Sequence, residues 1–235
     1  MSSSQPDTPD RVLLVTGASS GIGAETARRA SREGYRLVLA ARSDDRLSAL
    51  AESLGGSDRA IAVRCDVREW SDQQAMVQAA LDAFGRLDVV FANAGIGGTP
   101  GFQAESPEFW RDMVLTNVYG AALTIRAVMD ALRDSKGHLV LTGSVAGRIV
   151  YPGSLYSCTK WAVTAMGEAA RRELQGSRVR VTLVHPGVVD TPFFAEPEPV
   201  TIEAEDIARA ILFALQQPQH VDVNEIVVRP TDQEE

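Results

Sequence analysis

Tyr156 and Lys160 stand four positions apart in a stretch expected to be helical. Residues i and i+4 share a helix face, so the phenol and the ammonium should point the same way. A free tyrosine, with a pKa of about 10, is a poor base near neutrality. A neighbouring cation favours the phenolate, so Lys160 is predicted to lower the pKa of Tyr156 toward neutral pH. Such a pair also arises by chance on solvated helices, and its context must decide.

A serine that could stabilise developing negative charge precedes this pair. The run Leu139–Thr142 reads as a strand and leads into Gly143 and Ser144. This places the Ser144 hydroxyl at the carboxyl edge of a sheet, where open α/β sheets bind ligands. It could donate there to a carbonyl oxygen. A serine hydrolase is not indicated, because the residues around Ser144 do not read Gly-x-Ser-x-Gly. His185, at a strand end, is expected to be structural.

A glycine-rich turn follows the first apolar run, reading Thr-Gly-Ala-Ser-Ser-Gly-Ile-Gly from Thr16 to Gly23 before a helical stretch. A strand, a turn and a helix N-terminus together form an anion site through outward N–H groups and the helix dipole. Gly17 allows the tight turn, Gly21 admits a pyrophosphate, and Gly23 lets helix approach strand. The alternative is a turn that merely needs glycine, but its flanking strand and helix favour dinucleotide binding.

The second strand indicates which nucleotide the turn would bind. NAD-specific folds place a carboxylate near its end to accept from the ribose 2′-hydroxyl. Here the strand ends in Ala41, Arg42 and Ser43, with no carboxylate before Asp44. The Arg42 guanidinium and the Ser43 hydroxyl would hold a 2′-phosphate, which predicts NADP(H). A merely solvent-exposed Arg42 is the alternative, and Asp44 and Asp45 could weaken the preference.

Short β-branched runs alternate with amphipathic or Ala-rich stretches, which predicts βαβ units and a parallel sheet buried on both faces. The expected strands are Arg11–Thr16, Arg36–Ala41, Ala60–Cys65, Leu87–Ala92, His138–Thr142, Val179–His185 and Glu225–Arg229. The expected helices are Gly21–Glu33, Trp70–Phe84, Pro107–Leu132, Ser154–Leu174 and Glu203–Gln217. We predict one doubly wound α/β domain over 11–235, with a seven-stranded parallel sheet flanked by helices, a disordered tail over 1–10 and a surface loop at Pro192–Val200.

Composition argues against several classes of function. The net charge of −8 and the scattered basic residues argue against nucleic-acid binding. No segment approaches the run of about 20 apolar residues that a spanning helix needs. The polar stretch Met1–Asp10 resembles neither a signal peptide nor an anchor. Cys65 and Cys158 form neither a disulfide framework nor a metal-ligand cluster, so we expect a cytoplasmic protein without a metal site.

With these motifs in order, the chain resembles the short-chain dehydrogenases/reductases from about Val12 to Thr191. Asp66-Val67 looks like the family's adenine-contacting pair, and Asn93-Ala94-Gly95 matches its Asn-Asn-Ala-Gly motif with Ala92 in place of the first asparagine. Pro186–Thr191 resembles the segment that binds the nicotinamide carboxamide. The cofactor site implied by the turn, the second strand and the resemblance comprises Gly17, Ser19, Ser20, Gly21, Ile22, Gly23, Arg42, Ser43, Asp66, Val67, Asn93, Ala94, Gly95, Tyr156, Lys160, Pro186, Gly187, Val189 and Thr191.

The resemblance also implies a catalytic tetrad of Asn117, Ser144, Tyr156 and Lys160. Tyr156 would exchange a proton with the substrate oxygen, Ser144 would orient that oxygen, and Lys160 would hold the nicotinamide ribose. Asn117 would kink its helix and position a water in a proton relay. The implied activity is NADP(H)-dependent interconversion of a carbonyl and an alcohol by hydride transfer. An NAD-linked alcohol dehydrogenase and a non-catalytic nucleotide-binding regulator are the alternatives, and the intact tetrad argues against the latter.

The substrate would lie between the tetrad and the loop after Thr191. Phe193 and Phe194 suggest an apolar lid there, with ordinary loop packing as the alternative. The expected substrate contacts are Ser144, Val145, Tyr151, Tyr156, Phe193 and Phe194. The end of the chain, Asn224–Gln233, resembles a branch of the family that includes clavulanate dehydrogenase and NADP-dependent serine and 3-hydroxy-acid dehydrogenases. Family members usually form tetramers or dimers, so the resemblance implies a homotetramer or homodimer.

Overall fold

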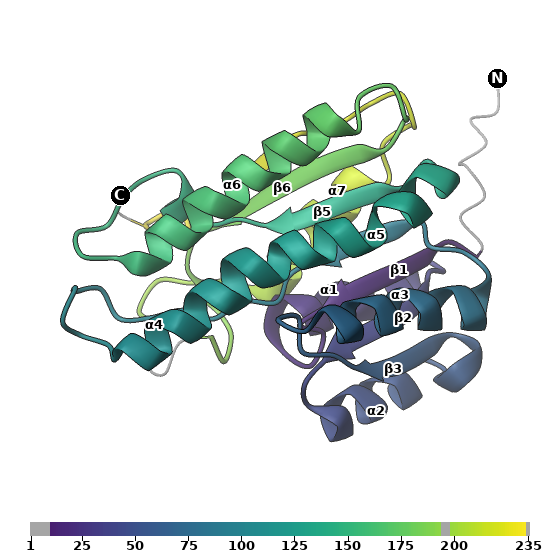
Figure 1. The fold of residues 1–235 in the computed structure, drawn as a ribbon, viewed down its shortest axis with the longest axis horizontal. Helices are drawn as coiled ribbons and strands as arrows, with labels where there is room; N and C mark the ends of the chain where they lie inside the picture. Colours follow the sequence, from purple (N-terminus) through teal and green to yellow (C-terminus); the bar gives the residue numbers. More distant parts are fainter. Residues whose placement is uncertain (1–9, 194–197, 234–235) are drawn as a thin grey trace.

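The computed structural model describes residues 10–193 and 198–233, which form a parallel seven-stranded sheet with helices on both faces (Figure 1). The strand order is β3-β2-β1-β4-β5-β6-β9, so the chain reverses direction along the sheet between β1 and β4. In open α/β sheets, ligands bind in the crevice at such a reversal. The strands are β1 (Val12–Thr16), β2 (Arg36–Ala41), β3 (Ala60–Arg64), β4 (Val89–Ala92), β5 (His138–Thr142), β6 (Arg180–Pro186) and β9 (Glu225–Val228).

The helices form two layers, one on each face of the sheet (Figure 1). One layer contains α1 (Gly21–Arg32), α2 (Asp44–Ser53) and α7 (Ala204–Leu215). The other contains α3 (Trp70–Phe84), α5 (Ala121–Ser135) and α6 (Leu155–Glu173). Side chains alternate between the faces along each strand, so Leu13 and Val15 join the first core while Val12 and Leu14 join the second.

The predicted fold class is confirmed, and each predicted strand agrees with the structure to within two residues at either end. The sequence interpretation did not include α2, whose buried side chains are only Leu47, Leu50 and Ala51 in a polar stretch. It also did not include two short strands, β7 (Val189–Asp190) and β8 (Ile202–Glu203), which pair with each other. Strands this short give no periodic pattern.

The single helix predicted over Pro107–Leu132 is interrupted, which corrects the sequence expectation. It consists of α4 (Pro107–Val114), a π-helix η2 (Leu115–Gly120) and then α5. Its predicted start is right, since the Ser106 hydroxyl accepts from the Phe109 amide at 3.1 Å. Gly120 lies against Val67, whose Cγ2 would be 2.8 Å from a Cβ at this position. Such widened turns occur often at functional sites.

Two of the segments predicted from the sequence are only partly described by the structure. The predicted tail over 1–10 lies outside the described residues, apart from Asp10, which forms an ion pair with Arg36 at 2.9 Å. In the predicted loop at 192–200, residues 194–197 also lie outside them. Within the described ranges, no helix has the length and apolar character needed to span a membrane.

Candidate active site

Asn93 joins the carboxyl ends of β1, β4 and β5. Its backbone N–H donates to Thr16 Oγ1 at 3.0 Å and its side-chain amide donates to the Thr16 carbonyl at 3.2 Å. Its Oδ1 accepts from the Thr142 hydroxyl at 3.0 Å. The strand ends are therefore held in register by one side chain, at the edge where the sequence predicts the site.

The glycine turn after β1 has the close packing that the sequence predicts. Gly17 and Gly21 adopt left-handed φ angles of +67° and +52°. A Cβ at Gly23 would lie 2.5 Å from the Gly17 carbonyl oxygen, so only glycine lets α1 approach the turn. Ser20 precedes α1, and its side chain makes no capping hydrogen bond to the first helical turn. The turn can therefore present amide donors to an anion.

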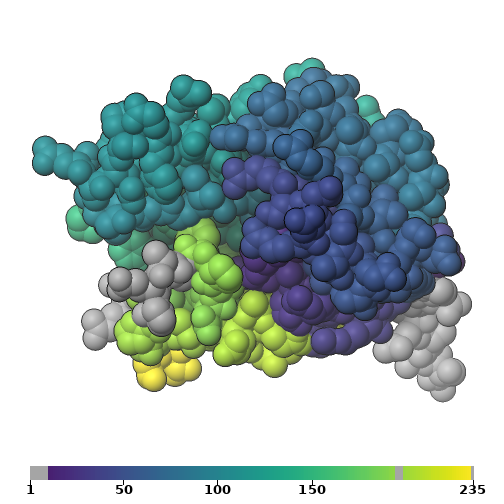
Figure 2. Space-filling model, turned by 90° about the horizontal axis from the view of Figure 1, so that it is seen from below, coloured from purple at the N-terminus to yellow at the C-terminus, as the bar shows by residue number. Residues whose placement is uncertain are grey.

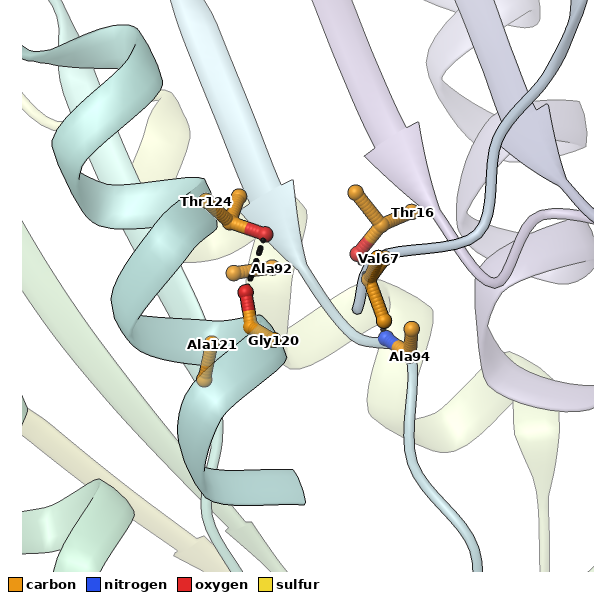
Figure 3. Close-up of a pocket in the computed structure, with 7 residues that line it drawn as sticks. All are labelled: Thr16, Val67, Ala92, Ala94, Gly120, Ala121 and Thr124. Atoms are coloured by element: carbon orange, nitrogen blue, oxygen red, sulfur yellow. Dashed lines mark hydrogen bonds between the residues drawn. The ribbon is translucent and has the colours of Figure 1, made fainter. Parts of the chain in front are cut away.

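A small pocket opens beside this turn, between the ends of β1 and β4 and the π-helix (Figure 3). Its lining residues are small or apolar: Thr16, Val67, Ala92, Ala94, Gly120, Ala121 and Thr124. The buried Gln73 side chain donates to the Val67 carbonyl at 2.8 Å and to Thr124 Oγ1 at 3.0 Å, which fixes this wall. Sequence reasoning missed Gln73, although a polar residue on the apolar face of a helix was a signal.

Arg42 and Ser43 lie where β2 passes into α2, as the sequence predicts. Arg42 is exposed, and the Ser43 hydroxyl accepts from Arg46 Nη2 at 2.7 Å. The structure thus adds a second guanidinium, from Arg46, to the group expected to meet a 2′-phosphate. Sequence reasoning missed Arg46 because α2 was not foreseen.

Asp66 and Val67, the expected adenine contacts, follow β3. Arg68 forms a two-point hydrogen bond with the Asp66 carboxylate, Nε to Oδ1 at 2.9 Å and Nη2 to Oδ2 at 2.6 Å. This hydrogen bonding from Arg68 lowers the pKa of Asp66. Val67 is buried and reaches the pocket wall.

Tyr156 and Lys160 lie on one face of α6, as predicted. Lys160 is only 4% exposed, its Nζ donates to the Thr142 carbonyl at 2.8 Å, and Nζ lies 5.7 Å from the centroid of the Tyr156 ring. Burial lowers the pKa of Lys160 to about 8.

The pKa of Tyr156 moves in the direction opposite to the sequence expectation. Burial raises it to about 12, and a hydrogen bond from Ser144 opposes that rise. Removing the phenolate from water outweighs favourable contacts with its charged form. The net lowering of the Tyr156 pKa that the sequence predicts is therefore not found.

His185 forms a hydrogen bond with the backbone of Ser144. It is fully buried, and its Nδ1 lies 3.1 Å from the Ser144 carbonyl oxygen. Because a carbonyl only accepts, Nδ1 is the protonated nitrogen in this contact. Gly143 makes room for the ring, since a Cβ there would lie 2.5 Å from Nδ1. The expected structural role of His185 is therefore specific: it holds the backbone on which Ser144 stands.

Asn117 lies in the π-helix with its side chain turned toward the loop after β4. It is buried, its Oδ1 accepts from the Ile96 amide at 2.8 Å, and its Nδ2 donates to the Ile96 carbonyl at 2.9 Å and to Thr159 Oγ1 at 3.1 Å. Gly95 lies between it and the lysine, because a Cβ there would be 3.7 Å from Lys160 Nζ. The predicted distortion of the Asn117 helix is thus present as a π-helix.

The aromatic ring of Phe193 contacts the ring of Tyr156. Phe193 is 39% exposed, and its ring centroid lies 5.7 Å from that of Tyr156 at an angle of 60°. Its edge covers Gly97, where a Cβ would lie 2.6 Å from Phe193 Cε1. Val145 is buried and Tyr151 is half-buried nearby, whereas the predicted contact Phe194 lies outside the described residues.

The Pro186–Thr191 segment returns to the glycine turn. Thr191 contacts the turn closely, since a Cβ at Gly21 would lie 3.2 Å from Thr191 Cγ2. The segment expected to meet the nicotinamide therefore touches the segment expected to meet the pyrophosphate. The predicted site residues that the structure describes lie at the carboxyl ends of the parallel strands or in the loops and helices that follow them.

Comparison with known families identifies the chain's relatives. The family model described as short chain dehydrogenase matches residues 11–199. The chain belongs to the short-chain dehydrogenase family. An uncharacterized oxidoreductase of Staphylococcus saprophyticus is 36% identical over 240 residues, covering 95% of this chain and 97% of the relative. The chain is accordingly an oxidoreductase of this family.

Solved structures of the family share the whole fold. An alcohol dehydrogenase of Thermococcus sibiricus in complex with 5-hydroxy-NADP has a TM-score of 0.89 and 32% identity, covering 96% of this chain and 99% of that one. A serine dehydrogenase with NADP+ has a TM-score of 0.87 and 28% identity, with coverage of 95% and 96%. A 3-ketoacyl-(acyl-carrier-protein) reductase of Brucella melitensis with NADH has a TM-score of 0.86 and 28% identity, with coverage of 93% and 96%. These short-chain dehydrogenases support a nicotinamide dinucleotide as the cofactor class.

Proposed function

We propose that this short-chain dehydrogenase is an NADP(H)-dependent enzyme that interconverts a carbonyl compound and an alcohol. The observation that carries the proposal is the buried Lys160 ammonium, whose Nζ lies 5.7 Å from the centroid of the Tyr156 ring, with Ser144 near enough to the phenol to oppose the rise of its pKa. The nicotinamide, when bound, supplies or accepts the hydride. The protein then has to orient the substrate oxygen and exchange one proton with it.

The glycine turn fits the pyrophosphate of such a cofactor. Side chains at Gly17 and Gly23 would fill the space in front of the backbone, because a Cβ at Gly17 would lie 3.0 Å from Ala94 Cα. Arg42, Ser43 and Arg46 would hold the 2′-phosphate at the exposed end of β2. The end of β2 carries no carboxylate before Asp44 that could accept from the 2′-hydroxyl of NAD(H). This is the reason for preferring NADP(H) over NAD(H).

The pKa of Tyr156 favours proton donation over proton removal at neutral pH. With a pKa of about 12, the phenol carries its proton throughout the neutral range. The protonated phenol is the form that carbonyl reduction requires, because the phenol gives its proton to the substrate oxygen, and Ser144 donates a hydrogen bond to the same oxygen.

Lys160 and Asn117 would support this proton transfer without exchanging the proton with the substrate themselves. Lys160 has donors beyond the one that it gives to Thr142, and these could reach ribose hydroxyls. Asn117 holds both polar atoms of the Ile96 backbone unit, so its first task is to shape the loop beside Lys160. Its part in a water-mediated proton relay stays a prediction.

We further propose a homodimer or homotetramer that pairs the α4–α5 and α6 surfaces. Tyr119 on the π-helix and Trp161 on α6 support this assembly, because they are 48% and 44% exposed and would gain by burial. The cytoplasmic location predicted from the sequence is compatible with the unpaired thiols of Cys65 and Cys158.

The test is consumption of NADPH and NADH by the purified protein over a panel of aldehydes and ketones, with Tyr156→Phe beside the wild type. Loss of the acid should lower kcat by about 10²- to 10⁴-fold. Tyr35→Phe is the matched control, since this buried tyrosine lies at the amino ends of the strands, away from the site, where its hydroxyl accepts from Arg11. Equal turnover by Tyr156→Phe would refute the catalytic assignment. Dinucleotide binding without turnover of any carbonyl or alcohol would favour the non-catalytic regulator, and a preference for NADH would favour the NAD-linked enzyme.

A further inference from the structure

The C-terminal segment after β9 packs against the loop that follows β6. The Gly187 amide donates to the Val228 carbonyl at 2.7 Å, and the Val188 amide donates to Gln233 Oε1 at 2.9 Å. In Figure 2 the yellow C-terminal residues lie on the surface beside yellow-green segments from the last part of the chain. The loop's successive amides are thus held by residues about forty positions further along the chain.

A turn aims the Gln233 side chain at this loop. Pro230 is buried, and the Gln233 amide donates to its carbonyl at 3.2 Å, which folds the segment back after β9. Gly187 is the counterpart on the loop. A Cβ at Gly187 would collide with Gln233 Oε1 and would lie 2.5 Å from Arg229 Cβ. The absence of a side chain at Gly187 therefore lets the C-terminal segment approach.

The loop that Gln233 contacts continues to the glycine turn. Val188 is fixed on both sides of its backbone, because its carbonyl also accepts from the Ile202 amide at 3.0 Å. The buried Val189 follows, and then Thr191, which packs on Gly21 of the glycine turn. The position of the Val188 backbone consequently sets the path of the chain between β6 and the turn.

We propose that Gln233 is a positioning residue for the nicotinamide half of the cofactor. Its side-chain carbonyl fixes the Val188 amide and thereby the orientation of Val189 and Thr191. The inference rests on the proposed function, in which Pro186–Thr191 meets the carboxamide. It assigns the end of the chain to the binding site through a contact with the loop and not through a contact with the cofactor itself.

The experiment compares binding of two probes at equilibrium, NADPH and 2′,5′-ADP, which lacks the nicotinamide. Gln233→Ala and Gln233→Leu remove the acceptor and leave the Val188 amide without its partner. The Kd for NADPH should rise by about 5- to 30-fold, the cost of one such hydrogen bond, while the Kd for 2′,5′-ADP stays unchanged. Gln233→Glu keeps an oxygen acceptor at this position and should restore binding to within about threefold of wild type.

Gln78→Ala is the matched control, because Gln78 is an exposed glutamine on α3 whose side chain donates to Asp82, one turn along the same helix, at 2.7 Å. The midpoint of thermal unfolding of each variant should shift by less than about 4 °C. An unchanged Kd for NADPH in Gln233→Ala and Gln233→Leu would overturn the inference. Equal weakening of both probes, or no rescue by Gln233→Glu, would do the same.

The proposed function fails in a different way from this inference. If the wild type binds neither NADPH nor NADH, the function is wrong. If it prefers NADH, the same comparison is made with NADH and 5′-AMP, and the part played by Gln233 is still measured.

Discussion

Removal of Arg42 or Arg46 should weaken NADPH binding and leave NADH binding almost unchanged. Arg42 is exposed at the end of β2, and Arg46 donates from α2 to the Ser43 hydroxyl at 2.7 Å. A charge-assisted hydrogen bond to a phosphate contributes about 1.5–3 kcal/mol, and solvent around an exposed guanidinium reduces this to about 1–2 kcal/mol. Arg42→Ala should therefore raise the Kd for NADPH by about 5- to 30-fold, and Arg46→Ala by a comparable or smaller factor.

The assay is a fluorescence titration of each variant with NADPH and with NADH at low and high salt. Because exposed charges are screened, the loss for NADPH should shrink as the ionic strength rises. Arg172→Ala is the control, since this arginine is exposed at the far end of α6 and pairs with Glu168. If Arg42→Ala changes the two Kd values by the same factor, the guanidinium does not recognise the 2′-phosphate, and the argument from the end of β2 is refuted.

Further predictions concern the acid, the turn and the serine backbone. Because the pKa of Tyr156 is raised to about 12, kcat/KM for alcohol oxidation should climb about tenfold per pH unit from neutrality upward while reduction stays level; a plateau of oxidation from about pH 7 would contradict this. Gly23→Ala should raise the Kd of both dinucleotides at least about tenfold, since its methyl would meet the Gly17 carbonyl; calorimetric titration would measure it, and unchanged binding would count against the turn. His185→Leu should lower kcat about 5- to 150-fold, because the Ser144 carbonyl loses its hydrogen bond, and His185→Asn should restore part of the lost kcat. Steady-state kinetics would measure both variants, and equal kcat values for the two would rule out a role for this contact.

The sequence predicted those parts of the fold that local pattern encodes. Buried parallel strands show as continuous apolar runs, and the turn from Gly17 to Gly23 shows as glycines between a strand and a helix. The interruption at Asn117 was not predictable as a π-helix, because no residue type in Leu115–Gly120 marks a widened turn and the close contact of Gly120 with Val67 joins segments far apart in the sequence.

The chemistry of the site was harder to predict than its membership. The identity of Tyr156 and Lys160 followed from their spacing, but the direction of the Tyr156 pKa did not, because burial is a property of the whole fold. The roles of Arg46 and Gln233 also depend on the folded structure, and the sequence analysis missed both. Arg46 lies on a helix that was not foreseen, and Gln233 contacts a loop that is distant in the sequence.

The side chain of Asn93 has a consequence for how the family's substrate range can change. Its Nδ2 donates to the carbonyl of Thr16, which leads into the turn proposed to bind the phosphates, and its Oδ1 accepts from Thr142, whose carbonyl accepts from the Lys160 ammonium. We expect a displacement of the glycine turn to shift the backbone that binds Lys160, and the reverse, so substitutions in one of these regions should also affect the other. We expect new specificities to arise in the loops around Gly97 and Phe193, which contact each other and take no part in the hydrogen bonds of Asn93.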